Sequence, residues 1–167
     1  MESLHKLENT FGNWLKPIPH LPTTWRKWMA DNVWWITLVG VILSVIGVFV
    51  LIGTLLTALS FFGAATSFYG YYMTQSYSGW WVASSIVSIL FIIVAAVITA
   101  RAVKPLKAMD NKGWELLFLA FVVGLASSLV SIVLNFNALS FLPSLISAAI
   151  SGAIGAYFLY EIRLYFK

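Results

Sequence analysis

The sequence contains no cysteine and few charged residues. The absence of cysteine excludes disulfides, thiolate metal sites and cysteine nucleophiles. Only 10% of the residues are charged, against roughly a quarter in soluble domains. The scarcity is localised, because no Asp, Glu, Lys, Arg or His occurs between Asp31 and Arg101 or between Glu115 and Glu161. A water-soluble fold would expose charged loops in both stretches, so the composition predicts a membrane protein.

Patterns that carry catalysis or bind metal are also missing. The two histidines, His5 and His20, precede the first long apolar run, and their spacing matches no metal site. The sequence has no phosphate-binding loop, nucleophile elbow or haem ligand within an apolar run. We therefore expect no cofactor and no enzymatic activity. The basic pI of about 9.4 does not indicate nucleic-acid binding, because the basic residues flank the apolar runs.

Four apolar runs are long enough to cross a bilayer, which takes about 20 helical residues. In chain order they cover about residues 33–57, 80–100, 114–135 and 142–162. We predict an all-α polytopic membrane domain at residues 33–167, with four transmembrane helices arranged as two hairpins. Residues 1–32 are predicted to form a separate cytoplasmic or interfacial arm.

The positions of lysine and arginine predict the orientation in the membrane. They fall only before the first run, between the second and third, and after the fourth: Lys6, Lys16, Arg26, Lys27, Arg101, Lys104, Lys107, Lys112, Arg163 and Lys167. An even number of spans places all of them on one side. Since basic loops stay cytoplasmic, we expect both termini in the cytoplasm.

The pattern Asp-Asn-x-x-Trp occurs at residues 31–35 and again at residues 110–114, each time beside the start of an apolar run. We expect Asp31 and Asp110 to cap helix starts, where an acidic side chain accepts from free N–H groups and suits the helix dipole. A parallel tandem repeat of the hairpins explains the match. Capping together with the headgroup preference of Trp explains it equally well.

The N-terminal arm is predicted to contain a short amphipathic helix lying in the inner interface. Its apolar residues recur at helical spacing: Leu4, Leu7, Phe11, Trp14 and Leu15. Pro17, Pro19 and Pro22 then favour an extended link, and a second short helix at residues 25–30 leads into the first span. The arm either seals the cytoplasmic rim or docks a partner subunit.

Small residues on the predicted spans form faces that let helix backbones approach closely. We expect helix packing at Gly40, Ser44, Gly47, Gly124, Ser128, Ser147, Ser151 and Gly155. Such faces suit a compact bundle or a homo-oligomeric contact. A polar permeation path lined by the serines is the alternative, although serine hydroxyls in helices more often bond to their own backbone.

Ionisable residues are few at membrane depth, and none lies near the middle of a span. Glu115 and Glu161 occupy the inner ends of the third and fourth runs. Because these helices run antiparallel and are joined by a short loop, we predict an ion pair between Glu115 and Arg163. A proton relay is the alternative role.

The connection at residues 58–79 is free of charge but rich in aromatic residues. We expect it to lie on the outer leaflet, partly helical, or to cover the outer mouth of the bundle. Its contact surface is predicted to comprise Phe68, Tyr69, Tyr71, Tyr72, Tyr77, Trp80 and Trp81. Lipid, pigment, quinone and a neighbouring subunit all suit such a surface.

The last third of the chain resembles small, uncharacterised four-helix membrane proteins of bacteria. The resemblance is carried by residues 112–118 (KGWELLF) and residues 157–166 (YFLYEIRLYF). In those proteins a similar entrance and an aromatic-Ile-Arg-x-Tyr-aromatic exit flank the final hairpin. The resemblance implies a location in the bacterial plasma (inner) membrane, and it carries no activity.

Two functions remain open from the sequence. The first is a non-enzymatic accessory, scaffold or self-associating subunit, with the lipid bilayer and either further copies or a larger membrane complex as its partners. The second is an oligomeric transporter or channel for a small neutral or apolar substrate. The lack of central charges argues against ion or proton coupling.

Overall fold

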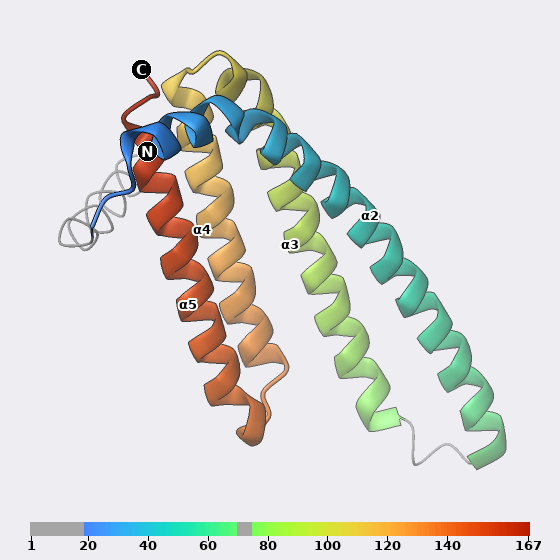
Figure 1. Ribbon diagram of the computed structural model, residues 1–167. Coiled ribbons are helices and arrows are strands. Elements are labelled where there is room, and N and C mark those ends of the chain that lie inside the picture. Colours follow the sequence, from blue (N-terminus) through green and yellow to red (C-terminus); the bar gives the residue numbers. More distant parts are fainter. Residues whose placement is uncertain (1–18, 70–74) are drawn as a thin grey trace.

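The computed structural model describes residues 19–69 and 75–167, and the secondary structure of this part is entirely helical. Its helices are α2 (Thr23–Tyr69), α3 (Gln75–Lys107), α4 (Asn111–Leu134) and α5 (Ala138–Arg163). Each contains a segment long and apolar enough to cross a membrane: Thr23–Phe61, Trp80–Lys107, Asn111–Leu134 and Leu139–Arg163. The prediction of an all-α chain with four candidate spans is confirmed. Figure 1 shows α3 beside α2, and α5 beside α4.

Helix α2 is much longer than the first predicted span. Its 47 residues extend over about 70 Å at 1.5 Å per residue, more than twice the roughly 30 Å of bilayer hydrocarbon. Its first turns run across the ends of α5 and α4 before the helix descends beside α3 (Figure 1). The connection at residues 58–79, predicted to be partly helical, is helical at residues 58–69, where α2 continues, and again from Gln75, where α3 begins.

The two Asp-Asn-x-x-Trp motifs have different local structures. Asp110 is the N-cap of α4, and its side chain accepts from the backbone N–H of Lys112 at 3.0 Å, as predicted. Asp31 lies inside α2, so the prediction that it caps a helix is wrong. The reason is that α2 already starts at Thr23 and continues without interruption through Asp31 into the first span. Instead, Asn32 accepts from the indole N–H of Trp35 at 2.8 Å.

The connection between α3 and α4 is a tight helix stop. The N–H of Asp110 donates to the carbonyl of Pro105 at 3.0 Å, and that of Met109 donates to Leu106 at 3.1 Å. This pair of bonds is a Schellman motif, in which one residue takes a left-handed conformation that usually requires glycine. Met109 occupies that position with φ of 55°. The C-terminal residue Lys167 then exchanges backbone hydrogen bonds with this turn, donating to Met109 and accepting from Asn111.

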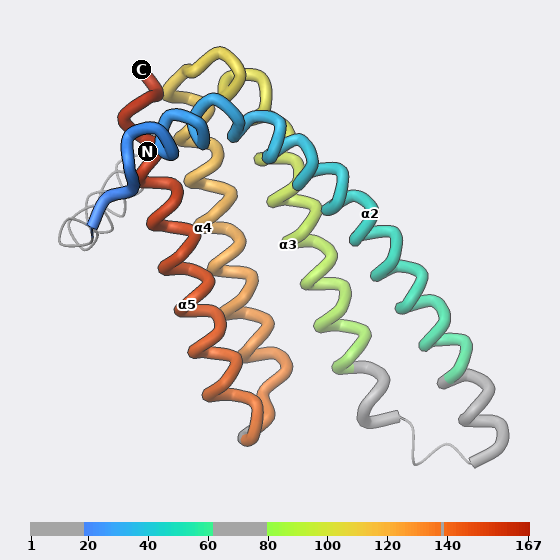
Figure 2. The backbone as a smooth tube through the Cα atoms, viewed as in Figure 1, coloured from blue at the N-terminus to red at the C-terminus, as the bar shows by residue number. Residues whose placement is uncertain are grey.

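The buried core gathers at the end of the bundle that holds this turn, the start of α2 and the C-terminus (Figure 2). Its members come from every described helix and from the C-terminal tail: Ala30, Ala102, Leu106, Trp114, Phe118, Leu159, Ile162 and Phe166. Away from this end most apolar side chains are exposed or partly exposed. In a strongly apolar 18-residue stretch of each candidate span, at most 11% of the residues are buried. A helix with so little burial within its own chain must face lipid or another protein.

Gly113, in the first turn of α4, marks the closest approach of two helices at this end. A Cβ atom added there would lie 2.5 Å from the backbone nitrogen of Leu106 and 2.8 Å from the carbonyl carbon of Pro105. Backbone atoms cannot move aside as a flexible side chain can. Glycine at this position therefore allows α4 to start directly against the end of α3.

We predict that Gly113→Ala destabilises the protein although alanine is the better helix former. Replacing glycine by alanine inside a helix normally stabilises it by about 1 kcal/mol, whereas overpacking here should cost about 1–3 kcal/mol. Gly124→Ala in the same helix is the matched control, because an added Cβ would meet no atom within 4 Å. Thermal unfolding in mild detergent measures both. Equal midpoints for the two variants would contradict the close contact.

Candidate functional site

Glu161 is a buried carboxylate in the last turn of α5. Its side chain is 3% exposed, although it lies two residues before the end of the helix. The C-terminal end of a helix carries partial negative charge and disfavours a nearby carboxylate. Burial adds a desolvation cost. Glu161 therefore requires positive partners from elsewhere in the chain.

Those partners come from the segment at the start of α2. The Nε of Arg26 lies 2.8 Å from Oε2 of Glu161 and donates a hydrogen bond to the backbone oxygen of the same residue at 3.3 Å. His20 brings Nδ1 to 2.7 Å from the other carboxylate oxygen, Oε1. Oε2 forms no aligned hydrogen bond within residues 19–69 and 75–167, so its contact with Arg26 is chiefly a charge interaction.

Two tyrosines of the C-terminal region hold the same segment from either side of Glu161. The hydroxyl of Tyr157 donates to the carbonyl of Pro19 at 2.8 Å, and that of Tyr165 donates to the carbonyl of Thr23 at 3.4 Å. Together with the contacts of Glu161, these bonds fasten residues 19–26 to the end of α5. The first and last parts of the described chain thus form one unit, which we call the latch: His20, Arg26, Tyr157, Glu161 and Tyr165.

The latch sits against the aromatic centre of the core. Trp114 is 1% exposed, and its indole N–H donates to the carbonyl of Leu159 at 2.9 Å. Its ring stacks on Phe118 with centroids 5.4 Å apart, and the guanidinium of Arg163 lies 5.0 Å from its centroid. Cations over a Trp face are attracted by the ring quadrupole.

Beside the core a cavity of about 560 Å³ opens among the helices. We call it the apolar cleft. It is lined by Met29, Val33, Ile36, Thr37, Gly40, Thr99, Leu117, Ala120, Phe121, Gly155, Phe158, Leu159 and Ile162. The hydroxyl of Thr99 donates to the carbonyl of Ala95 at 2.7 Å, so its polar group is already satisfied within its own helix.

A second cavity, of about 700 Å³, lies between α4 and α5. We call it the serine groove. It is lined by Phe121, Gly124, Leu125, Ser128, Ile132, Pro143, Ser144, Ser147, Ala148, Ser151 and Gly152. Ser128 donates to the carbonyl of Gly124 at 3.1 Å. Within the described residues, the hydroxyls of Ser144, Ser147 and Ser151 form no hydrogen bond.

The residues predicted for helix packing fall into two groups. Gly155 is in close contact, because an added Cβ would lie 2.8 Å from the ring of Phe121. By contrast, a Cβ at Gly40, Gly47 or Gly124 would meet no atom within 4 Å, so these three glycines are not at close helix contacts within one chain. The serines and glycines predicted on α4 and α5 line the serine groove instead: Gly124, Ser128, Ser147 and Ser151. Ser44 bonds to the carbonyl of Gly40.

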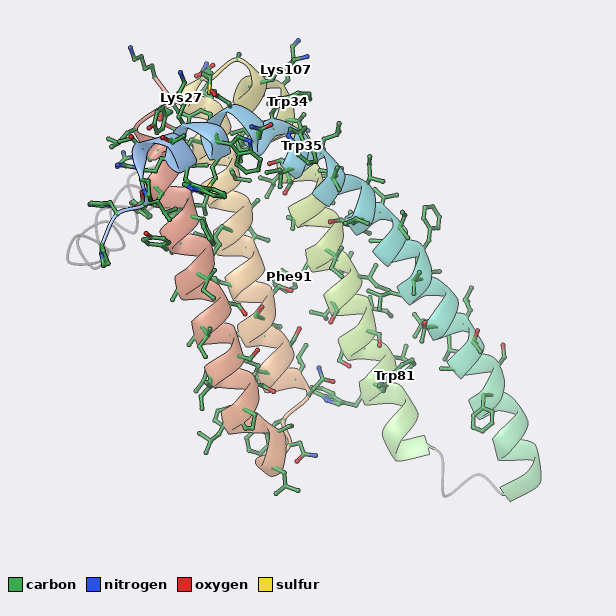
Figure 3. All side chains as sticks on the ribbon, viewed as in Figure 1. Lys27, Trp34, Trp35, Trp81, Phe91 and Lys107 are labelled. Atoms are coloured by element: carbon green, nitrogen blue, oxygen red, sulfur yellow. The ribbon has the colours of Figure 1, made fainter. Side chains whose placement is uncertain are left out.

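The other predicted site residues are dispersed. Glu115 accepts a hydrogen bond from Asn111 at 2.8 Å, and Arg163 lies over Trp114; their mutual pairing stays a prediction. At the opposite end of the bundle, where Figure 3 labels Trp81, Trp80 donates to the carbonyl of Leu134 at 2.6 Å. Trp81 lines a small cavity formed by α2, α3 and Asn135. The remaining predicted aromatics lie outside the residues whose side chains are described: Phe68, Tyr69, Tyr71, Tyr72 and Tyr77. The same holds for the arm helix at residues 4–15.

Sequence reasoning missed the latch, although one signal for it was available. An even number of spans returns the end of the last helix to the side where the chain begins. Glu161 is the single carboxylate of residues 116–167, and Arg26 is the first arginine of the chain. Because Arg26 and Glu161 are 135 positions apart, the sequence pattern favours the nearer pair, Glu115 and Arg163.

We predict a strong coupling between Arg26 and Glu161. Arg26→Met leaves a buried carboxylate without its guanidinium, which should cost about 3 kcal/mol. Glu161→Gln should also destabilise the chain, and the double variant should recover part of the combined loss. Lys27→Met is the matched control, since Lys27 is an exposed neighbour in the same helix. Thermal unfolding in detergent, measured for the wild type and the four variants, gives the loss of stability for each. Strictly additive losses in the double variant would show that Arg26 and Glu161 are uncoupled.

Comparisons with known proteins give no relative for this arrangement. No family model, no curated protein and no solved structure matches the chain. In the described residues no three His, Asp or Glu side chains lie close enough together to hold a metal ion. Function must therefore be argued from the latch, the apolar cleft and the serine groove.

Proposed function

We propose that this chain is a non-enzymatic integral membrane protein that acts by association, as an accessory, scaffold or self-associating subunit. In this proposal the spans form two hairpins in a bacterial plasma membrane, with both termini cytoplasmic and the N-terminal arm in the inner interface. A parallel repeat of the hairpins is supported by the motif match at residues 31–35 and 110–114. The different local structures of the two motifs argue against it.

The observation that carries the proposal is the serine groove. Its hydroxyls at Ser144, Ser147 and Ser151 lack hydrogen-bond partners within the described chain. A hydroxyl left unpaired in hydrocarbon costs free energy, and small polar residues are the usual contact points between membrane helices. A helix from another subunit or from a second copy would fill the groove and supply acceptors.

The end of the bundle that holds the buried core, which we call the core end, is placed in the cytoplasm in this proposal. The distribution of charge supports this placement. The lysines and arginines of the described chain lie in the first turns of α2, around the connection between α3 and α4, and at or after the end of α5. Hydrogen bonds and ring contacts join these three regions at one end of the bundle. Such a one-sided distribution is typical of cytoplasmic loops.

Cysteine labelling tests the predicted orientation. The chain has no native cysteine, so only an introduced cysteine can react. Phe136→Cys, in the exposed connection between α4 and α5, should react with a membrane-impermeant maleimide on intact cells. Lys112→Cys, at the start of α4, should react only after the membrane is permeabilised. The reverse result would overturn the orientation.

We predict that filling the serine groove abolishes association. The variant Ser147→Leu with Ser151→Leu places bulk in the groove, whereas Ala149→Leu with Ala153→Leu adds the same bulk at exposed positions outside it. Native mass spectrometry after extraction in nanodiscs should find partner chains with the wild type and the control, and a single chain with the groove variant. A wild type that is always a single chain would contradict the proposal.

The alternative function, an oligomeric transporter or channel for a small neutral or apolar substrate, is favoured by the same serines. If several copies turn their grooves inward, the hydroxyls line a shared path instead of a contact. A closed ring of copies with no foreign subunit would support this alternative. In such a ring, the groove variant should lose flux while the number of copies stays the same.

A further inference from the structure

The apolar cleft has the features of a lipid site. Its volume of about 560 Å³ falls in the range of about 300–1,000 Å³ found for small-molecule sites. Residues of all four described helices line it, from Met29 and Ile162 near the core to Gly40 further along α2. Its lining is almost entirely apolar, and it lies within candidate spans. In a bilayer such a cleft must be occupied, because an empty cavity of this size loses contacts on every wall.

Charge at the core end indicates which lipid would be held. In residues 19–167 this end carries eight lysines and arginines against four carboxylates. Glu161 offsets Arg26, while Asp110 is engaged as a helix cap. No carboxylate of the described residues pairs with Lys27, Lys104 or Lys107, and all three lysines are exposed. The excess charge is positive and close to where the cleft begins.

Lys107 lies near the same end of the bundle as the cleft residues Met29 and Val33. Its Nζ lies 4.9 Å from the centroid of the Trp34 ring, and Trp34 packs against the buried core, as the cleft residue Val33 does. Figure 3 shows Lys107 and Trp34 together at the core end, with Lys27 on the same end. A cation beside an indole at the end of a span is placed at headgroup depth.

We propose that the apolar cleft binds one acyl chain of an anionic phospholipid whose phosphate contacts the basic residues around Lys107. An acyl chain has nearly the same free energy in the cleft as in the bilayer, because both surroundings are apolar. The acyl chain alone therefore gives little preference for binding. Selectivity then comes from the headgroup, because basic residues attract anionic lipid electrostatically. This site adjoins the serine groove at Phe121, but all its other lining residues are different. It stands whether or not the proposed association is correct.

The test uses the full-length chain purified in mild detergent and titrated with phosphatidylglycerol or with phosphatidylcholine of the same acyl chains. Native mass spectrometry counts the lipids retained per chain. We expect one phosphatidylglycerol to be retained, and phosphatidylcholine to bind at least about fivefold more weakly. Lys107→Gln should reduce the preference for phosphatidylglycerol by about fivefold.

Gly40→Leu tests the acyl-chain part. Gly40 lines the cleft, and a Cβ there meets no atom within 4 Å, so a leucine there is expected to extend into the cleft. Gly53→Leu, on the same helix and outside the cleft, also meets no atom within 4 Å and is the matched control. The first variant should lose the retained phosphatidylglycerol, and the second should keep it.

Three outcomes would overturn the proposal. Gly40→Leu retaining phosphatidylglycerol like the wild type would show that the lipid binds elsewhere. Equal retention of the two lipids, unchanged by Lys107→Gln, would exclude the headgroup contact. A wild-type dimer that retains no lipid and becomes a single chain on Gly40→Leu would assign the cleft to a second copy. The groove variant separates the two proposals, since it should change association and leave lipid retention intact.

Discussion

The packing of Trp114 at the core end is the interaction on which the arrangement of the helices depends. Its buried indole joins α4 to α5 through the carbonyl of Leu159, and its ring lies between Phe118 and the guanidinium of Arg163. Few side chains are buried elsewhere in the described helices. In a bilayer, apolar exposure costs nothing, so helices need specific packing and hydrogen bonds to define their positions. Here those contacts are concentrated at one end.

The latch completes this end by adding the start of α2 to the same unit. A buried carboxylate near a helix C-terminus is unstable alone. Arg26 compensates its charge, and the imidazole of His20 lies within hydrogen-bond distance of it. Because the pair joins the first and last described helices, it closes the bundle around the core. Closure at one end leaves the long, exposed helix faces, the apolar cleft and the serine groove available for other molecules.

The cleft and the groove differ in chemistry, and so do the occupants that we assign to them. The groove exposes serine hydroxyls that need acceptors, which another helix provides and a lipid chain does not. The cleft is apolar and lies toward the end of the bundle that carries Lys27, Lys104 and Lys107, which suits a molecule with an apolar chain and an anionic head. If both proposals hold, one small chain presents a surface for protein and, beside it, a site for lipid.

The sequence by itself determined the all-α class, the four candidate spans and the cap at Asp110, because these depend on local composition and on the length of apolar runs. It also located the small residues of α4 and α5 that line the groove. Only the tertiary structure decided that α2 continues through Asp31, that Glu161 pairs with Arg26, and that a Cβ at Gly40 or Gly47 would meet no atom within 4 Å among the described residues. The physical reason is that such contacts join residues far apart in the chain, whose meeting depends on how whole helices cross.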